Sequence, residues 1–201
     1  MKVLVVTGGI GSGKSVVCRI LAENGFPLQY NADARAKELY NECPQLLIDI
    51  EESLGISCRD SDGRFVPAAL AARIFSDKAA LEKVEQLLFP VMMADFEAFV
   101  NKAGENEYVV FESATLLEKP YFDGFGDKIL LVDAPMEMRL ERAAARDGAS
   151  REVIQARMQN QKHMNALSDG AMDPRIDIVL KNVGTTEELK KELLNILTIN
   201  L

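Results

Sequence analysis

Residues 3–15, Val-Leu-Val-Val-Thr-Gly-Gly-Ile-Gly-Ser-Gly-Lys-Ser, are the stretch that decides the fold of this chain. The apolar first part predicts a buried β-strand, and apolar residues at helical spacing after Ser15 predict a helix. Between them lies a loop with the spacing G-x-x-x-x-G-K-S, whose glycines let the backbone curl and bring N–H groups close to phosphate oxygens. The order of strand, loop and helix therefore predicts a nucleoside triphosphate site at a helix N-terminus, rather than a flexible Gly/Ser turn.

The polar residues of this loop have expected roles. The Lys14 ammonium would reach the β- and γ-phosphates and assist catalysis, and the Ser15 hydroxyl would bind the metal. ATP and Mg²⁺ are therefore the expected cofactors. The loop residues expected to contact ATP are Gly9, Gly11, Ser12, Gly13, Lys14, Ser15 and Val16.

The composition is that of an ordinary globular chain. With 201 residues, 48% of them hydrophobic and 27% charged, we expect a single domain over residues 1–201. There is no apolar run as long as a membrane span and no signal-peptide pattern, so we expect a cytoplasmic protein with no membrane partner. A formal net charge of −8 argues against a nucleic-acid partner, because such a partner requires a basic face. A small-molecule substrate is expected instead.

Short apolar segments alternate with helical stretches, which is typical of an α/β fold with a mostly parallel, five-stranded sheet. The expected strands are residues 3–6, 27–30, 108–111, 129–132 and 176–180. Helices are expected at residues 14–24 and 186–197, the second with a capping box formed by Thr185 and Glu188.

The second expected strand ends at residue 30 and the third begins at residue 108, a longer separation than an α/β connection needs. We expect residues 44–103 to be an inserted helical subdomain that forms a wall of the acceptor-substrate pocket. Its expected helices are residues 44–53, 68–75 and 78–100, the last interrupted by Pro90. A helical cap with a purely structural role is the alternative.

Asp33 follows the second expected strand, at the sheet edge where open parallel sheets bind ligands. This position favours a role as the general base, which would accept a proton from an attacking hydroxyl in line with the γ-phosphate. The same residue has the chemistry of an N-cap for a helix over residues 34–40, so both interpretations stay open.

Arginines gather in a later segment, residues 136–168, which we expect to form a lid. Arg139, Arg142 and Arg146 share one helical face because they are spaced at i, i+3 and i+7. Guanidinium groups pair well with phosphate oxygens, so we expect Arg139 and Arg142 to take part in catalysis and Arg146 to bind ATP as the lid closes. A solvated charged helix is the alternative.

Two other residues have weaker signals. Glu112, at the end of the third expected strand, is placed to bind Mg²⁺ through water or to contact substrate, or else to cap Ser113. His163 lies in a polar stretch and is expected to face solvent.

A family resemblance rests on residues from several parts of the chain: Thr7–Ser15, Ala32 and Asp33, Arg139, Arg142, Arg146 and Asp147, Gln161, and Lys181–Gly184. In this combination the chain resembles the dephospho-CoA kinases over nearly its whole length. The resemblance implies a three-layer P-loop kinase fold with a helical insertion and an Arg-rich lid. It also implies transfer of the ATP γ-phosphate to the ribose 3′-hydroxyl of dephospho-CoA, the last step of coenzyme A synthesis. Asp33 would be the base, and Asn182 would border the adenine.

The chain departs from the family pattern mainly on the acceptor side. Asn31 replaces an Asp and Lys37 an Arg, while Phe89-Pro90 stands for His-Pro and Pro67 for an Arg. The family's P-L-L-F-E run is Ala114–Glu118 in this chain. These differences keep open a kinase for another nucleoside or small alcohol, and the further alternative is a catalytically weak nucleotide-binding module.

Overall fold

The structure is a computed structural model and describes residues 1–75, 77–104 and 107–200. Contacts between residues divide the chain into two compact units. The first unit contains Met1–Asn31 and the described residues after Gly104, and the second contains Ala32–Gly104. The second unit begins earlier than residue 44, where an insertion is expected, because it includes the helix that directly follows the second strand.

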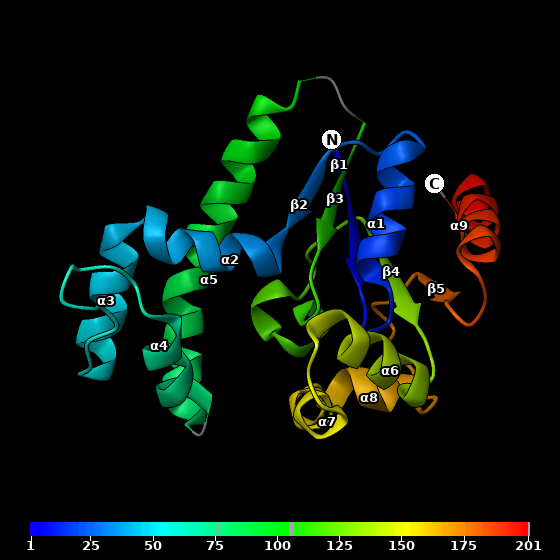
Figure 1. The fold of residues 1–201 in the computed structure, drawn as a ribbon. Helices are drawn as coiled ribbons and strands as arrows, with labels where there is room; N and C mark the ends of the chain where they lie inside the picture. The colour runs from blue at the N-terminus through cyan, green and yellow to red at the C-terminus, as the bar shows by residue number, and fades with distance from the viewer. Residues whose placement is uncertain (76, 105–106, 201) are drawn as a thin grey trace. The chain divides into compact units, whose positions relative to one another are not determined.

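A five-stranded sheet with the order β2-β3-β1-β4-β5 forms the centre of the first unit (Figure 1). Its strands are β1 (Lys2–Thr7), β2 (Gln29–Asn31), β3 (Tyr108–Glu112), β4 (Lys128–Asp133) and β5 (Ile178–Lys181). All neighbouring strands are parallel, so the expected α/β class with a five-stranded sheet is confirmed. The strands β1, β3 and β4 are buried apolar runs, as is typical of parallel strands that are covered on both faces.

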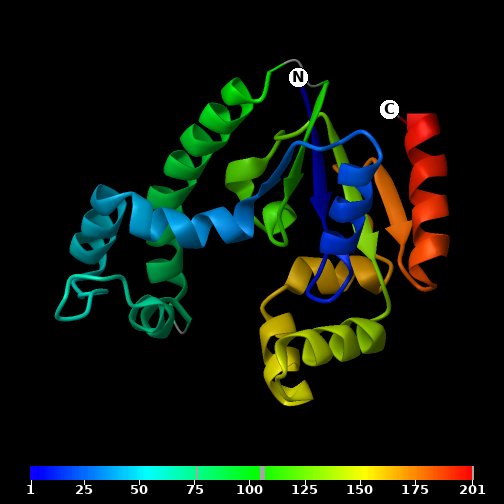
Figure 2. The same ribbon diagram turned by 45° about the horizontal axis from the view of Figure 1, so that its top comes forward.

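Helices α1 (Lys14–Glu23) and α9 (Thr186–Asn200) lie side by side on one face of the sheet (Figures 1 and 2). Leu21 of α1 and Leu193 of α9 are fully buried in one core, together with strand residues such as Leu4. The Thr185–Glu188 capping box is confirmed, because Thr185 N donates to Glu188 Oε2 (2.8 Å) and Glu188 N donates to Thr185 Oγ1 (3.3 Å).

Aromatic side chains gather beside β3 in the same unit. Phe111 of β3 stacks on Tyr30 of β2, with ring centroids 5.4 Å apart. Phe122 and Phe125 pack against Phe111 from the segment after β3, which contains the short 3₁₀ helices η1 (Leu116–Glu118) and η2 (Pro120–Phe122).

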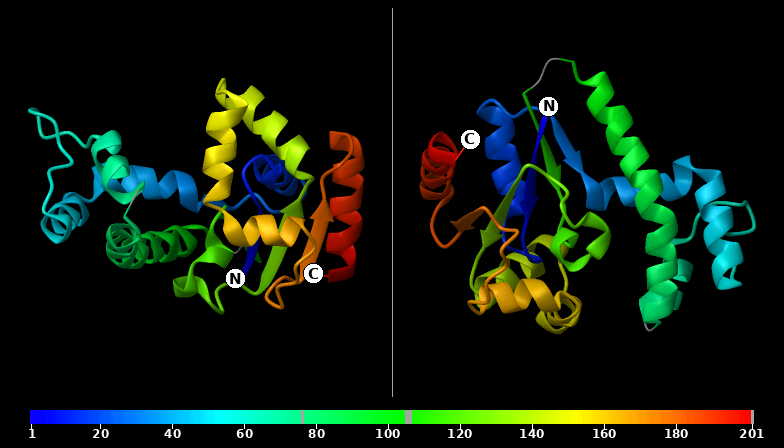
Figure 3. Two further views of the ribbon diagram at one scale, coloured as in Figure 1. Left: turned by 90° about the horizontal axis from the view of Figure 1, so that it is seen from below. Right: turned by 180° about the vertical axis from the view of Figure 1, so that it is seen from behind.

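The remaining helices of the first unit are α6 (Met136–Asp147), α7 (Arg151–Gln159) and α8 (Lys162–Ser168), beyond the carboxyl end of β4 (Figure 3). The α6 and α7 helices share a small apolar core of their own, formed by Leu140, Ala143, Ile154 and Met158. The chain turns between them at Gly148, whose φ is +60°. This hairpin lies within the residues expected to form a lid.

The second unit is helical and contains α2 (Ala32–Glu42), α3 (Pro44–Leu54), α4 (Pro67–Phe75) and α5 (Lys78–Lys102). Its core is formed by buried side chains such as Leu46, Ile50, Leu70, Val84 and Leu88. An ion pair between Arg35 and Asp95 (2.8 Å) joins α2 to α5. Of the described helices in either unit, none has the length and apolar character needed to cross a membrane.

The expected interruption of the long helix at Pro90 is wrong, because α5 continues through this residue. A proline inside a helix removes one N–H donor and crowds the carbonyl one turn earlier. Contacts with α2, α3 and α4 hold α5 in place, and they offset this local cost.

Candidate nucleotide-binding site

The glycine-rich loop joins β1 to α1 at the middle of the sheet, where the strand order reverses. In open parallel sheets, ligands bind beyond the carboxyl ends of the strands at such a point. Val16 N and Val17 N both donate to the Gly13 carbonyl (3.0 and 3.1 Å), so the loop continues directly into the first turn of α1. The N-terminus of α1, which is the positive end of its dipole, faces the loop, and the first turn contains no acidic side chain that would offset this charge.

Close packing also requires glycine in this loop. A Cβ atom at Gly9 would collide with the guanidinium of Arg139, and one at Gly11 would collide with the Arg139 backbone carbonyl. A Cβ atom at Gly13 would meet the side-chain amide of Asn182. The loop is thus enclosed by α6 and by the segment after β5, a reason for glycine that the motif alone does not reveal.

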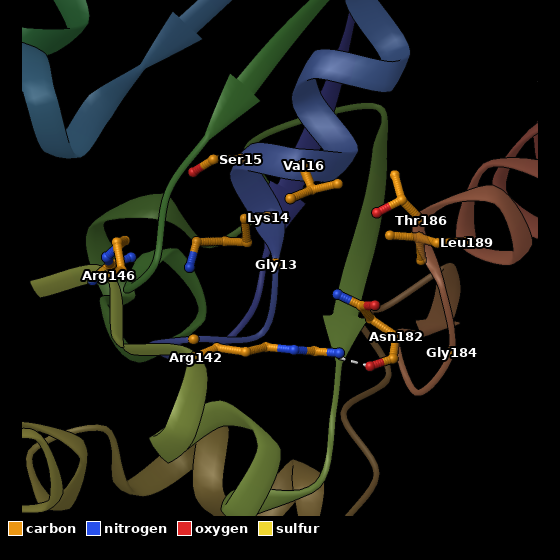
Figure 4. A pocket seen from close by; sticks show the side chains of 11 residues that line it. Gly13, Lys14, Ser15, Val16, Arg142, Arg146, Asn182, Gly184, Thr186 and Leu189 are labelled. Atoms are coloured by element: carbon orange, nitrogen blue, oxygen red, sulfur yellow. Dashed lines mark hydrogen bonds between the residues drawn. The ribbon is translucent and has the colours of Figure 1, made fainter. Parts of the chain in front are cut away.

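A cavity of about 350 Å³ opens beside the loop (Figure 4). Three cationic side chains line it, one from the start of α1 and two from α6. The lining residues are Gly11, Gly13, Lys14, Ser15, Val16, Arg142, Arg146, Asn182, Gly184, Thr186 and Leu189. The structure therefore brings most of the expected ATP-contacting residues to one cavity, whose charge suits an anion.

Lys14 curls back over the loop, where its Nζ donates to the Gly8 carbonyl at 2.8 Å. Arg142 lies across the cavity and its Nη1 donates to the Asn182 carbonyl at 3.0 Å, as Figure 4 shows. The Asn182 side chain in turn donates to the Ser12 carbonyl at 2.8 Å. Asn182 therefore both lines the cavity and supports the loop.

Ser15, Glu112 and Asn31 meet at the carboxyl ends of the strands. Ser15 Oγ donates to Glu112 Oε1 (3.1 Å), and Asn31 Nδ2 donates to Glu112 Oε2 (2.7 Å). The Glu112 carboxylate is buried, and it does not cap Ser113, whose N–H donates to the Val6 carbonyl (3.1 Å). The interpretation that Glu112 caps Ser113 is therefore wrong, because the Val6 carbonyl already accepts the Ser113 N–H.

A hydroxyl beside a carboxylate offers oxygen donors of the kind that Mg²⁺ prefers. Across the described ranges 1–75, 77–104 and 107–200, no group of three or more His, Cys, Asp or Glu residues is arranged to hold a metal ion. Ser15 and Glu112 therefore fit a Mg²⁺ ion that takes most of its ligands from phosphates and water.

Arg139 differs from the other two arginines. Its side chain is almost completely buried beneath the loop, and Nε donates to the Ile10 carbonyl at 3.1 Å. Burial lowers the pKa of this guanidinium, although Asp133 opposes the shift. Arg139 is not among the residues that line the cavity, so its guanidinium holds the loop from below in this conformation.

Arg146, by contrast, is exposed at the last turn of α6 and pairs with Asp147 (2.7 Å). Asp147 also pairs with Arg157 of α7 (2.6 Å). Hydrogen bonds from Arg146 first and Arg157 second lower the pKa of Asp147 to about 2. Of the three arginines on this face of α6, Arg139 is buried, Arg142 is half-buried and Arg146 is exposed, so the alternative of a solvated charged helix fits Arg146 alone.

A polar network around Arg139 carried no signal in the sequence. Arg139 Nη1 donates to Ser168 Oγ (3.0 Å), and Ser168 Oγ donates to Asp133 Oδ1 (2.9 Å). Lys181 Nζ pairs with Asp133 Oδ2 at 2.5 Å. This pair could be predicted only from the parallel register of β4 and β5, which places Asp133 beside Lys181.

Asp33 lies in the first turn of α2, in the second unit, and its side chain is exposed. The expectation that it caps a helix beginning at residue 34 is wrong, because α2 begins one residue before it, at Ala32. Its role as a base stays a prediction.

The side chain of His163 is 35% exposed, so the expectation that it faces solvent holds in part, because the ring also contacts an acidic side chain. Its Nε2 lies 2.7 Å from Asp173 Oδ2. The pKa of Asp173 is lowered, above all by hydrogen bonds from Arg175. The pair is 10 residues apart in sequence, a separation that no helical or strand pattern brings together.

Comparisons with known proteins agree with this geometry. The family model described as dephospho-CoA kinase matches residues 2–188. A curated dephospho-CoA kinase of Deinococcus radiodurans is 38% identical over 192 residues, which cover 94% of this chain and 88% of that protein.

Solved structures share the fold. The protein TT1252 from Thermus thermophilus has a TM-score of 0.83 at 30% identity, covering 100% of this chain and 97% of that one. A dephospho-CoA kinase from Campylobacter jejuni has a TM-score of 0.58 at 22% identity, covering 98% of this chain and 96% of that one, and this likeness concerns the fold alone.

Proposed function

This chain belongs to the dephospho-CoA kinase family, and on that basis we propose that it transfers the γ-phosphate of ATP to the ribose 3′-hydroxyl of dephospho-CoA. The products are coenzyme A and ADP. The observation that carries this proposal is the cavity in which Lys14, Arg142 and Arg146 surround the start of α1. Phosphoryl transfer asks the protein mainly for positioning and for neutralisation of charge, and these residues supply both.

On the nucleotide side, backbone N–H groups of the loop and the N-terminus of α1 bind the phosphates, and Lys14 neutralises the β- and γ-phosphates. Arg142 and Arg146 add positive charge from α6. Asn182 and Gly184, which line the far side of the cavity, border the adenine. Arg139 contributes through the loop that it supports.

Mg²⁺ is the second cofactor of the proposal. Ser15 supplies one ligand, and Glu112 accepts a hydrogen bond from a metal-bound water. The support for this assignment is the short distance between Ser15 Oγ and Glu112 Oε1 (3.1 Å) together with the burial of the carboxylate. When bound, the ion neutralises charge on the phosphates during transfer.

On the acceptor side, Asp33 is the general base that orients the 3′-hydroxyl and accepts its proton. Asp33 follows Asn31, the last residue of β2, and β2 is parallel to its neighbour β3. The strand therefore ends at the sheet edge that also carries the loop. The helical unit that contains Asp33 provides further acceptor contacts.

The reaction is proposed to take place in the cytoplasm, and neither a membrane nor a nucleic acid is a partner. The free thiols of Cys18, Cys43 and Cys58 suit a reducing compartment. The net charge of −8 opposes binding to a nucleic-acid backbone.

A coupled assay of ADP release tests the proposal, with dephospho-CoA measured beside a panel of nucleosides and sugars. We expect dephospho-CoA to give the highest kcat/KM. A higher kcat/KM for another alcohol would show that the chain is a kinase with a different acceptor. The departures from the family pattern at Pro67 and Phe89 in the second unit are the reason to test this outcome. ATP binding without release of ADP for any acceptor would contradict the proposal and leave a binding module.

A further inference from the structure

Gln161 stands between α7 and α8 with its side chain directed at the glycine-rich loop. The residue is 5% exposed, and its Oε1 accepts a hydrogen bond from Ile10 N at 2.7 Å. Its Nε2 donates to the Ala114 carbonyl at 3.3 Å. One buried amide thus joins the loop after β1 to the segment after β3.

The chemistry of the two partners fixes the orientation of this amide. Ile10 N–H is a donor and the Ala114 carbonyl is an acceptor, so only one of the two flip states satisfies both. A glutamate would satisfy Ile10 alone, and an apolar side chain of the same length would satisfy neither. Glutamine is therefore the one residue of this length that makes both bonds.

The main-chain groups of Gln161 are also held. Its N–H donates to the Met158 carbonyl (2.9 Å), and its carbonyl accepts from Asn165 N (3.0 Å). The α8 helix, which begins directly after Gln161, runs beside the loop in Figure 2. The amide thus extends toward the loop from a fixed support.

The two peptide groups on either side of the Ile10 Cα atom are both held. Arg139 Nε holds the Ile10 carbonyl (3.1 Å) while Gln161 holds its N–H. Ile10 is also followed by Gly11, whose φ of +76° sets the direction in which the loop continues from the Ile10–Gly11 peptide. Release of one contact would therefore let the loop turn away from the conformation that receives phosphates.

We propose that Gln161 is a positioning residue for phosphoryl transfer, which fixes the phosphate-binding loop and couples it to the Ala114 segment. The inference rests on the proposed function, because it assumes that the loop binds a nucleotide. It assigns Gln161 no contact with the substrate. The expected consequence of its loss is poorer nucleotide binding by protein that is still folded.

The test replaces Gln161 by methionine, which keeps the length of the side chain and removes both hydrogen bonds. We expect the KM for ATP to rise about tenfold, with a matching rise in the Kd for Mg-ADP measured by calorimetry. A merely structural role would reduce the folded fraction and leave both constants unchanged, because neither depends on the amount of active protein. Gln155→Met, the same change at an exposed site on α7, is the matched control and should change neither constant.

Hydrogen exchange at the Ile10 amide gives a readout that needs no nucleotide. We expect slow exchange of the Ile10 amide in the unmodified chain and faster exchange in Gln161→Met, with the amides of β1 unchanged. If the methionine variant does not fold, Gln161→Glu keeps an acceptor for Ile10, so Ile10 stays protected while the KM for ATP rises about threefold.

The two failures can be told apart. If the unmodified chain does not bind Mg-ADP, the proposed function fails, and the exchange measurement still decides whether Gln161 holds the loop. If the chain binds Mg-ADP and a folded Gln161 variant has the same KM and Kd, the inference is overturned. Equal exchange of the Ile10 amide in the unmodified chain and in Gln161→Met would overturn it as well.

Discussion

The nucleotide side of the first unit follows the family pattern of its functional residues closely, whereas departures from that pattern lie in the second unit and at Asn31 and Ala114–Glu118 of the first. In the first unit, one cavity is lined by the glycine-rich loop with its lysine and serine and by two arginines of α6. The third arginine, Arg139, supports the loop. In the second unit, Phe89 and Pro67 stand where the family has other residues, yet the helices are well packed. The difference teaches that phosphate binding leaves little freedom of residue type, while the helical unit, which we propose binds the acceptor, can depart from the pattern and still fold.

Replacement of Lys14 by alanine should give the largest effect on the nucleotide side. Removal of the ammonium leaves phosphate charge without its partner, so we expect kcat/KM for ATP to fall about 10³-fold. Steady-state kinetics and calorimetry with Mg-ADP measure the change. An unchanged ATP affinity would contradict the role of the loop.

Asp33→Asn tests the first contribution of the second unit to the reaction. The amide cannot accept the proton, so we expect kcat to fall about 10²-fold while the Kd for ATP stays the same. Glu38→Gln, an exposed change on the same helix, is the control. Normal turnover by the Asp33 variant would remove this residue from the base role and leave the chemistry to the first unit.

Gly11→Ala tests whether packing on α6, beyond backbone conformation, requires glycine in the loop. Gly124 is the matched control, since its φ of +79° is close to the +76° of Gly11 but it has open space around it. We expect Gly124→Ala to lower the free energy of unfolding by about 1 kcal/mol and Gly11→Ala to lower it by about 2–3 kcal/mol. Equal losses in chemical denaturation would show that contact with Arg139 adds nothing.

Glu112→Gln separates metal binding from nucleotide binding within the first unit. The side chain keeps its shape and loses its charge, so we expect the Mg²⁺ concentration for half-maximal rate to rise about tenfold. Glu107→Gln, exposed just before β3 and far along the strand from Glu112, should leave it unchanged. If the Mg²⁺ concentration for half-maximal rate is the same in the Glu112 variant, this carboxylate does not contribute to metal binding.

Phe89→His restores the residue that the family pattern has in the second unit, and its expected effect is the smallest. One added hydrogen-bonding group is expected to lower the KM for dephospho-CoA about fivefold, with no change in the KM for ATP. Phe75→His, at a residue that is 75% exposed in the same unit, is the control. A change in the KM for ATP instead would contradict the assignment of acceptor binding to the second unit and of ATP binding to the first.

The sequence predicts most strands well because they are short apolar runs bounded by turn residues, whereas β2 is polar at both ends and begins two residues after the expected start at residue 27. It also predicts the loop, since residue type and spacing are dictated by phosphates. Pro90 was the main error in the helices, because the tertiary contacts that hold α5 straight have no signature in a local pattern.

The site was only partly predictable for a related reason. Helical spacing places Arg139 on the same face as Arg142 and Arg146, but it cannot tell which of them the fold will bury. The depth of Arg139 depends on Ile10 and Ser168, which are distant in sequence. The positions of Glu112 and Asn31 likewise depend on the order of strands in the sheet.

The most direct test is to identify the product that the purified chain forms from Mg-ATP and dephospho-CoA. Mass spectrometry and phosphorus NMR would locate the new phosphate. We predict one added phosphate on the ribose 3′-oxygen, with one ADP released for each coenzyme A formed. A phosphate at another position, or ADP release without phosphorylated acceptor, would contradict the assignment of the reaction.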